Sequence, residues 1–428
     1  MDVLSSARVK RTRCAALWAV AIIMTPALAS GTDPVREDWP QWRGPNRDGV
    51  SRETGLLVDW RSRKPQRIWQ VPLGTGFSSF AVADGRLYTL ASLDRREYVF
   101  CLDAADGRTL WRVPSGATHR DTSGGDGPRS TPTVDGDRVY TLGAEGLLQC
   151  LNAEDGTVRW KHDVLKEFGA ENLNWGVSMS PLLNGDQLLV NVGAKGASIV
   201  AFNKYTGKVD WRALDDVAGY SSPIKISVGG SGDAAVEEFV FFCGKALVGI
   251  SPRDGAEHWR YKWITTSDMN IATPIYDPGT RMLFISASRD TGRCSAYRLT
   301  ASHHGVRSEH LYTNKNMRNH FNGCVLVDGY VYGFDNSVLK CIRLADGEEM
   351  WRHRSVGKGS LVAAQGHLYV LGERGDLAVV EATHEAYREK GRFKALDSSR
   401  AWTPPALAHG RLYVRDLENA ACIDISAD

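Results

Sequence analysis

A short motif recurs along the chain at nearly constant spacing, and it restricts the fold more than any other feature. Each of five copies places a Gly four residues before a Trp, at Trp111, Trp160, Trp211, Trp259 and Trp351. The spacings between these tryptophans are 49, 51, 48 and 92 residues, and 92 is twice 46, so one degenerate copy occupies the last gap. A fixed period of this length indicates a repeat architecture, in which every unit packs on its neighbours.

Each unit also contains a turn signal followed by a short strand pattern. Asp84-Gly85 precedes Leu87-Tyr88, and Asp328-Gly329 precedes Val331-Tyr332. Asp-Gly pairs favour tight hairpins because they accept positive φ, and the alternation that follows has the two-residue period of a half-buried strand. A unit therefore holds about four short antiparallel strands and no convincing helix.

Counting both landmarks predicts eight units. They open near Ser79, Thr131, Ser180, Ser222, Thr273, Gly323, Ser360 and Thr403. Seven of them close at Trp111, Trp160, Trp211, Trp259, about Tyr312, Trp351 and about Phe393. The eighth stops at Asp428 before its closing strand, and a matching strand with Trp69 is left over near the other end. We therefore predict an all-β, eight-bladed β-propeller of four-stranded antiparallel blades over residues 66–428, closed by the N-terminal strand at 66–73, since closure removes exposed sheet edges. The alternative, an open solenoid, leaves the last sheet incomplete.

The N-terminus is predicted to be a targeting segment. Basic residues at 8–13 precede an apolar run from Cys14 to Met24, and Ala27-Leu28-Ala29 has the small-residue pattern of a signal-peptidase site. We expect a signal peptide at 1–29, cleaved after Ala29, an N-terminal arm at 30–65 and an exported protein that is periplasmic or secreted. A membrane anchor is the alternative, but the run is shorter than the roughly 20 residues a spanning helix needs. No later run reaches that length, so no transmembrane segment is expected in the mature chain.

The charge balance argues against a nucleic-acid partner. Lys and Arg number 52 and Asp and Glu 50, a net charge of +2. Residues 1–29 hold four positive and one negative side chains, so the mature chain has a net charge of −1. Binding of nucleic-acid phosphates needs a basic face, which this composition does not indicate. We expect a monomer.

The cysteines are interpreted as core residues. Cys101, Cys150, Cys341 and Cys422 share one repeat position, which Ala201 and other small residues fill elsewhere. Such a position is typical of small buried residues, and free Cys packs well there. Disulfides or a metal site are the less favoured alternatives, because seven cysteines after residue 29 cannot all pair. Asp103, Asn152 and Asn203 share another position, where we expect them to cap turns.

The repeat motif carries a family resemblance. Leu102-Asp103, Gly107 and Trp111-Arg112 together resemble the PQQ-like repeat of quinoprotein dehydrogenases and of the BamB propellers of outer-membrane assembly. The resemblance implies that the repeated Trp residues stack between neighbouring blades. The segment from Trp39 to Pro45 is similar to the leader of exported bacterial proteins with such repeats. WD40 propellers fit less well, because here each repeat Trp precedes Arg or Lys and the period exceeds 45 residues.

The same resemblance bears on enzymatic activity. Quinoprotein dehydrogenases, as the family implies, hold their quinone under adjacent cysteines, beside Ca²⁺ and an Asp base. This sequence has neither a Cys-Cys pair nor a Cys-x-x-Cys-His haem motif. His384-Glu385 begins like a zinc-protease motif, but Arg388 replaces the second His. We identify no catalytic or metal-ligating residue; the cofactor stays unassigned, with PQQ and Ca²⁺ as an alternative that no Cys-Cys pair supports.

One set of polar and aromatic residues is predicted to converge. In a propeller the innermost strands line a central channel, so the residues just before each opening point share one mouth. Convergent aromatic and polar groups favour a ligand-binding funnel. The alternative is loops that bind only one another and water. The predicted cofactor- or ligand-binding residues are Arg129, Asn174, Trp175, Tyr220, Asn270, Asn319, His320, Lys358 and Trp402.

Together these observations predict an exported, non-catalytic binding or scaffold protein in cell-envelope or outer-membrane protein assembly. We expect protein partners in the envelope and a small-molecule ligand in the funnel. Cys14 begins the apolar run rather than following it, so lipid anchoring is not carried over from the resemblance. The alternative is a PQQ-dependent oxidoreductase acting on an alcohol or a sugar, with Trp175 or Trp402 stacking on the cofactor and Arg129 or Lys358 binding its carboxylates.

Overall fold

The structure is a computed structural model that describes residues 1–2, 33–229, 235–288, 292–397 and 400–427. Residues Pro34–Asp428 form one compact unit. The predicted signal peptide at 1–29 and its cleavage site after Ala29 lie outside the described residues, apart from Met1 and Asp2. Within the described ranges, every helix is too short to span a membrane.

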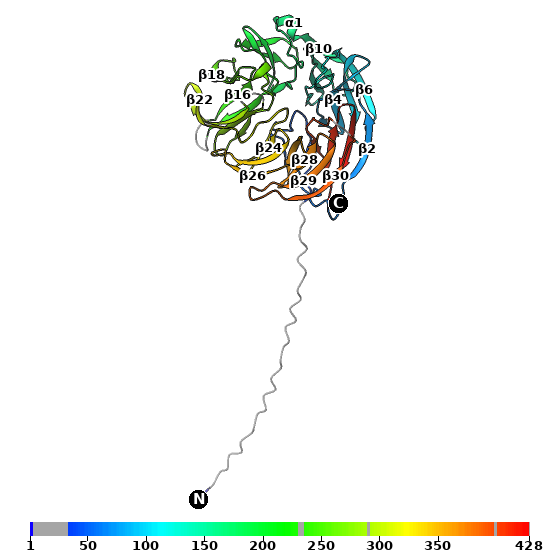
Figure 1. Ribbon diagram of the computed structural model, residues 1–428, viewed down its shortest axis with the longest axis vertical. Helices are drawn as coiled ribbons and strands as arrows, with labels where there is room; N and C mark the ends of the chain where they lie inside the picture. The colour runs from blue at the N-terminus through cyan, green and yellow to red at the C-terminus, as the bar shows by residue number, and fades with distance from the viewer. Residues whose placement is uncertain (3–32, 230–234, 289–291, 398–399, 428) are drawn as a thin grey trace. The chain divides into compact units, whose positions relative to one another are not determined.

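Eight antiparallel sheets are arranged around a central axis as blades (Figure 1). Blade 1 consists of β3 (Ala81–Ala83), β4 (Arg86–Leu93), β5 (Arg96–Asp103) and β6 (Thr109–Ala117), and blade 2 of β7 (Thr133–Asp135), β8 (Arg138–Leu142), β9 (Leu147–Asn152) and β10 (Val158–Asp163). Blade 3 consists of β11 (Leu182–Asn184), β12 (Gln187–Ala194), β13 (Ala197–Asn203) and β14 (Val209–Ala213), and blade 4 of β15 (Ile224–Val228), β16 (Val236–Phe242), β17 (Ala246–Ile250) and β18 (Glu257–Lys262).

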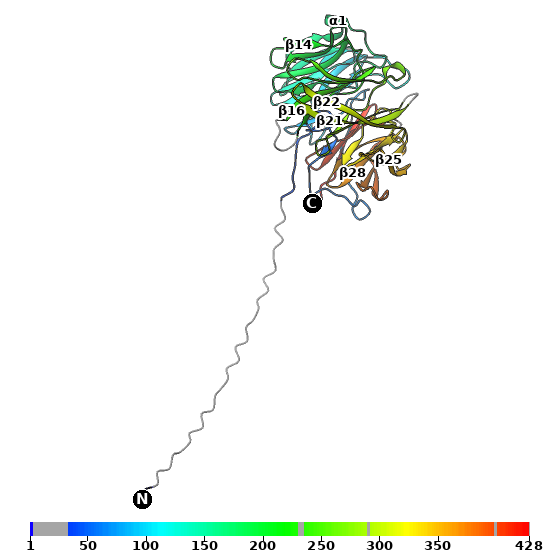
Figure 2. The same ribbon diagram turned by 90° about the vertical axis from the view of Figure 1, so that its left-hand side faces the viewer.

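Blades 5 to 7 follow in chain order, and blade 8 combines strands from both ends of the chain. Blade 5 consists of β19 (Ile275–Asp277), β20 (Met282–Ala287), β21 (Arg293–Ser302) and β22 (Gly305–Asn314), and blade 6 of β23 (Val325–Val327), β24 (Tyr330–Asp335), β25 (Val338–Arg343) and β26 (Glu349–His353). Blade 7 consists of β27 (Gly359–Ala364), β28 (His367–Gly372), β29 (Asp376–Glu381) and β30 (Glu389–Lys394), and blade 8 of β31 (Ala406–Ala408), β32 (Arg411–Arg415), β33 (Asn419–Asp424) and β2 (Gln66–Pro72). The predicted eight-bladed propeller is confirmed. In Figure 2, β16 lies beside β22 of the next blade.

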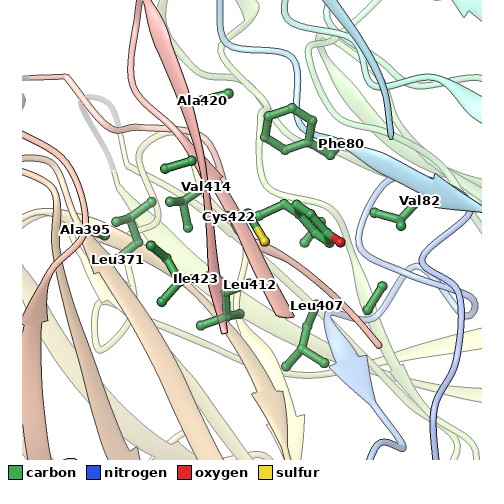
Figure 3. Close-up of a cluster of buried hydrophobic side chains, with 14 of the residues drawn as sticks. Phe80, Val82, Leu371, Ala395, Leu407, Leu412, Val414, Ala420, Cys422 and Ile423 are labelled. Atoms are coloured by element: carbon green, nitrogen blue, oxygen red, sulfur yellow. The ribbon is translucent and has the colours of Figure 1, made fainter. Parts of the chain in front are cut away.

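The N-terminal strand closes the ring, as predicted. β2 pairs antiparallel with β33, and Trp69 lies opposite Cys422. Figure 3 shows the core at this closure, where Cys422 lies between Phe80 of the blade 1 side and Leu371 of blade 7. All three side chains are buried, so pairing the two ends of the chain completes an apolar core as well as a sheet.

A repeat Trp can connect its own blade to the next one, as the junction of blades 1 and 2 illustrates. The Trp111 ring lies 5.9 Å from the Tyr88 ring of its own blade. Its indole N–H donates to the carbonyl oxygen of Ala153, 3.1 Å away in blade 2. Gly156 of blade 2 has φ +76°, and a Cβ there would lie 2.8 Å from the Trp111 ring. The Gly of a motif is therefore required by the aromatic ring that closes the preceding blade, which is Trp in four of the five copies and Tyr312 before Gly347.

Blade 7 departs from this scheme. The strand position opposite Val379, where six blades carry Trp and blade 5 carries Tyr312, is Gly391. The predicted closing residue Phe393 lies two positions further, opposite Leu377. The ring that fills the space belongs to Trp60 of the N-terminal arm: it lies 6.0 Å from the Tyr369 ring and is fully buried. A Cβ on Gly391 would lie 2.7 Å from the Trp60 Cβ, so the missing side chain makes room for the arm.

Local details agree with the expected turn chemistry, with one addition. Asp103 and Asn152 accept backbone N–H groups two residues ahead, at 2.8 and 2.9 Å, and so cap their turns as predicted. A short helix that the strand pattern did not indicate, α1 (Val164–Phe168), begins after Asp163, whose carboxylate accepts from the Lys166 N–H at 3.1 Å. A 3₁₀ turn, η1 (Thr266–Asp268), lies before blade 5. The seven cysteines of the described residues are all buried and unbridged.

Candidate functional site

The N-terminal arm lies across the central channel. Trp39 pairs with Val82 of β3 at one side of the ring. On another side, β1 (Val50–Ser51) of the arm adds to β27 as a parallel strand. The carboxylate of Glu53 then accepts from the backbone N–H groups of His409 and Gly410 in blade 8. The arm is therefore held by backbone pairing from blade 1 to blade 8.

Two buried arginines hold the middle of the arm in the channel. Arg47 donates to the carbonyl oxygens of Ser180, Pro181 and Pro223, at 2.9, 3.0 and 2.9 Å, at the starts of blades 3 and 4. Arg43 donates to the carbonyl oxygen of Cys324 at the start of blade 6. Burial lowers the pKa of Arg47 to about 9. In the described part of the chain these guanidinium groups donate to carbonyl and amide oxygens, and the charge of Asp48 also opposes the effect of burial on the pKa of Arg43.

Above the arm, the loops that precede the inner strands enclose a cavity of about 250 Å³. Its floor includes Trp42 of the arm, whose indole N–H donates to the Thr273 hydroxyl at 2.9 Å. Five of the nine predicted residues line this cavity together: Arg129, Trp175, Tyr220, His320 and Trp402. The convergence predicted for this end of the channel is thus present in the structure, while any binding role of these residues stays a prediction.

Stacked aromatic rings form one wall of the cavity. Trp402 lies between Phe77 and Phe321, with ring centroids 5.5 and 4.8 Å apart and interplanar angles of 16° and 27°. A cation lies over each end of this row: the Arg129 guanidinium is 5.3 Å from the Phe77 ring, and the Lys358 ammonium is 4.3 Å from the Phe321 ring. The row is therefore held in place by both stacking and cation–π contacts.

The charges that line the cavity are paired. Arg129 donates to the Asp121 carboxylate at 2.9 Å and to the Gly127 carbonyl at 2.8 Å. Burial opposes ionisation of Asp121, but hydrogen bonds from Ser123 and Gly124 and the charge of Arg129 lower its pKa below the ordinary value. Burial also lowers the pKa of Arg129, against the charge of Asp121. The result is a neutral ion pair at the edge of the cavity.

Two polar atoms in the wall have no hydrogen-bond partner in the described part of the chain. One is the Tyr220 hydroxyl: burial raises its pKa to about 12, against the nearby backbone N–H groups of Trp175 and Asn174, and its O–H has no acceptor. The other is the side-chain oxygen of Asn322, whose amide nitrogen donates to the Gly359 carbonyl at 2.9 Å. Tyr220 is 6% exposed and Asn322 4%. A buried polar atom without a partner costs about 1–3 kcal/mol of folding free energy, so these two side chains are held there by their apolar packing.

The remaining predicted residues lie outside the cavity lining. Asn270 donates to the carbonyl oxygens of Cys243 and Gly244, at 2.7 and 3.0 Å, and Asn319 donates to that of Phe334 at 3.0 Å. Both asparagines therefore brace the loops rather than face a guest. The exposed Asn174 lies beside Trp175, and the Lys358 ammonium is 2.7 Å from Nδ1 of His320, behind the aromatic row.

Several lining residues were not singled out from the sequence. Phe321 and Asn322 follow the predicted His320, and Phe77 lies two residues before the predicted opening point Ser79, so a window before every opening point would have included all three. Asp121 and Ser123 belong to the long loop before β7, and only their pairing with Arg129 and Trp175 places them here. No repeat signal marks any of them, because each blade contributes a different side chain.

A quinone cofactor with Ca²⁺ does not fit this donor set. Such a pair needs a carboxylate base and a cluster of oxygen ligands for the ion. Among the lining residues, Asp121 is the one carboxylate, and it accepts from Arg129 and Ser123. The described ranges contain no group of three or more His, Cys, Asp and Glu side chains arranged to hold a metal ion.

Curated and solved proteins with similar chains include assembly factors and dehydrogenases. Over 303 residues the chain is 22% identical to the outer membrane protein assembly factor BamB of Yersinia pestis, covering 67% of this chain and 71% of that protein. The crystal structure of BamB from Moraxella catarrhalis superposes with a TM-score of 0.57 at 13% identity, covering 85% of this chain and 98% of that one.

A quinohemoprotein alcohol dehydrogenase from Pseudomonas putida HK5 superposes with a TM-score of 0.54 at 11% identity, covering 91% of this chain and 80% of the enzyme. Identities this low show a shared propeller fold and leave function open. The family model described as outer membrane protein assembly factor BamB matches residues 53–122 and 95–352, which is most of the propeller. The chain therefore belongs to the BamB family of PQQ-like repeat propellers.

Proposed function

We propose that this protein is a non-catalytic scaffold of the bacterial envelope that takes part in outer-membrane protein assembly. The match of residues 53–352 to the BamB family carries the proposal. The similarity to the dehydrogenase is a similarity of fold. The one carboxylate among the lining residues, that of Asp121, already pairs with Arg129. A scaffold needs a rigid body with a shaped surface, and the buried arm and the closed ring supply one.

In this proposal residues 1–29 are a signal peptide, 30–65 the arm and 66–428 the propeller, and the mature protein is a periplasmic monomer. Mass spectrometry of the protein purified from the periplasm tests the first point. A mature N-terminus at Ser30 supports it, and retention of residues 1–29 contradicts it. Light scattering of the same sample tests for a monomer.

A deletion strain of the source bacterium tests the assembly role. Folded outer-membrane β-barrels migrate differently from boiled ones in gels, so the folded fraction of each barrel is measured directly. We expect that fraction to fall in the deletion strain and to recover when the full-length protein is restored. Unchanged barrel levels in the deletion strain would exclude the role.

A titration tests the enzymatic alternative independently. The purified protein is mixed with micromolar PQQ and Ca²⁺, and cofactor absorbance and dye reduction with alcohols and sugars are followed. We expect neither binding nor turnover. Saturable cofactor binding with dye reduction would favour the oxidoreductase over the scaffold.

A further inference from the structure

We propose that His119 is a pH-responsive latch at the rim of the cavity. Its ring holds the segment at residues 173–176 while both ring nitrogens carry a proton, and it releases that segment when one proton is lost. The latch lies beside the cavity lining, because Trp175 belongs to the held segment, and Asp121 and Ser123 belong to the loop that carries His119. The inference concerns a device within the fold and does not depend on the scaffold function proposed above.

Both ring nitrogens of His119 face hydrogen-bond acceptors. Nδ1 lies 2.7 Å from a carboxylate oxygen of Glu145, in the turn between β8 and β9, and Nε2 lies 3.2 Å from the backbone carbonyl oxygen of Asn174. A neutral imidazole has one N–H donor, whereas the imidazolium ion has two. The two hydrogen bonds therefore form together only when the ring is protonated. In the neutral ring, one nitrogen lone pair faces an oxygen with no proton between them.

The position of the ring is fixed by the chain around it. The backbone N–H of His119 donates to the Glu97 carboxylate of β5 at 3.4 Å, and its carbonyl oxygen accepts from the Gly127 N–H at 3.0 Å. A Cβ on Gly176 would lie 3.1 Å from the ring, so the ring packs directly against this glycine. The His119 side chain is 12% exposed. Loss of a proton therefore changes the hydrogen bonding of a ring that stays in place.

Loss of one proton should free Asn174 rather than Glu145. A hydrogen bond to a carboxylate is stronger than one to a neutral carbonyl, so the remaining N–H stays with Glu145. The segment at 173–176 then relies on its other contacts. Among these are the hydrogen bond from the Trp175 indole to the Ser123 hydroxyl at 3.3 Å and the packing of Trp175 on Tyr220, with ring centroids 5.7 Å apart. A weaker hold on Trp175 changes the edge of the cavity.

The charged groups around the latch include a second carboxyl that titrates near neutral pH. Burial raises the pKa of Glu97 to about 7, against the hydrogen bonds from Ala144 and His119. This value lies in the range where histidines change charge, so the responses of Glu97 and His119 have to be separated by experiment. The other charged groups are Glu145 in its turn, Glu171 before the held segment, and the pairs Arg120–Asp126 and Arg129–Asp121 on the loop of His119.

Nitrogen NMR of the native protein tests the protonation of the ring directly. Protein with ¹⁵N-labelled histidine is titrated from about pH 5 to about pH 8, the range in which histidines change charge. The signals of His119 are those that His119→Gln removes and Glu145→Gln shifts. We expect both ring nitrogens to carry a proton at the acid end and only Nδ1 at the basic end. An unchanged number of protons over this range, or a remaining proton on Nε2, would overturn the proposal.

Hydrogen exchange tests the release of the segment. After correction for the intrinsic effect of pH on exchange, the amides of residues 173–177 should exchange about three- to tenfold faster at the basic end than at the acid end, because one hydrogen bond is lost. His119→Gln stays neutral and should exchange fast at both ends. Glu97→Gln should keep the native response, which separates the two titrating groups.

His162→Gln is the matched control for the exchange experiment. The His162 ring also lies close to a carboxylate, with Nδ1 2.8 Å from Glu167, but it belongs to β10, the outermost strand of blade 2. This variant should keep the native pH response at 173–177. No pH response in the native protein, or the same response in His119→Gln, would refute the latch. Loss of the response in Glu97→Gln would place the switch at Glu97 instead of His119.

Discussion

The junction of blades 1 and 2 and the outer face of blade 7 solve the same packing problem with different parts of the chain. Trp111 comes from the blade itself, is partly exposed and bonds to the Ala153 carbonyl of the next blade. Trp60 comes from the arm, is fully buried and bonds to Leu57 of the arm at 2.9 Å. Both rings lie about 6 Å from a buried Tyr. The ring geometry thus demands an aromatic side chain at this place but not a particular source for it.

Replacing each tryptophan in turn should give the largest difference in stability between the two regions. Trp60→Ala should destabilise the protein by about 3–5 kcal/mol, because it leaves a cavity in a fully buried site beside a Gly that cannot fill it. Trp111→Ala should cost less, since part of that ring is already in water. Urea unfolding of both variants measures the difference, and equal costs would show that the arm docks no more tightly than a blade does.

The glycines of the repeat provide the next test. Gly156→Ala should cost about 2–3 kcal/mol, because it combines positive φ with a Cβ only 2.8 Å from Trp111. Gly136→Ala is the matched control: its φ is +54°, but a Cβ there would meet nothing within 4 Å, so about 1 kcal/mol is expected from strain alone. Thermal melts compare the two, and a smaller loss for Gly156→Ala than for its control would contradict the Trp–Gly packing scheme.

Blade 4 extends the comparison to a repeat Trp whose acceptor is ionisable and lies in its own blade. The Trp259 indole donates to the buried Glu238 carboxylate at 2.9 Å, and the other oxygen lies 2.9 Å from Nδ1 of His258. Burial raises the pKa of Glu238 to about 8, against the Trp259 hydrogen bond, and lowers that of His258 below 6.5. In the folded protein Glu238 therefore keeps its proton up to about pH 8. In the unfolded chain both Glu238 and His258 have lost their protons above pH 6.5.

Between pH 6.5 and 8 the folded state then binds more protons, so stability should fall as the pH rises, by up to about 1.4 kcal/mol per pH unit. Glu238→Gln keeps both hydrogen bonds without the charge and should flatten this slope. Urea unfolding at several pH values measures it, with Glu97→Gln as a control for another buried glutamate, whose pKa burial raises to about 7. A slope that persists in Glu238→Gln would place its origin elsewhere.

The smallest expected effect concerns the turn caps. Asn152→Ala removes the bond from the side-chain oxygen to the Glu154 N–H at 2.9 Å and should cost about 0.5–1.5 kcal/mol. Asp155→Ala, in the same turn, removes a similar bond to Thr157 at 2.8 Å. Differential scanning calorimetry should show a small fall in melting temperature for each, and a loss as large as that of Trp60→Ala would argue against a purely local role.

The propeller was predictable because its determinants are local and repeated. The Gly–Trp pairs recur because one blade packs on the next, and the strand left over at Trp69 indicates that the N-terminal strand closes the ring. Trp60 was not predictable, since it lies outside every repeat and replaces a side chain that Gly391 lacks. The site was predictable in outline, because the loops before the inner strands must converge. It was not predictable in detail. Asn270 is a polar residue of the same type as the lining residues, yet its amide nitrogen donates to the carbonyl oxygen of Cys243.

The arm across the channel has a consequence for the order in which the chain acquires its structure. Its anchoring points lie in blades 1 to 8, and β2 must await β33, which follows the other strands of the propeller in the sequence. The arm and β2 are therefore synthesised before the blades but reach their final place after them. Joining the two ends spans most of the chain, which carries a loop-closure entropy that grows with length and slows folding. Until the final strand arrives, the nascent protein is an open series of blades with bare edges, in need of protection from aggregation.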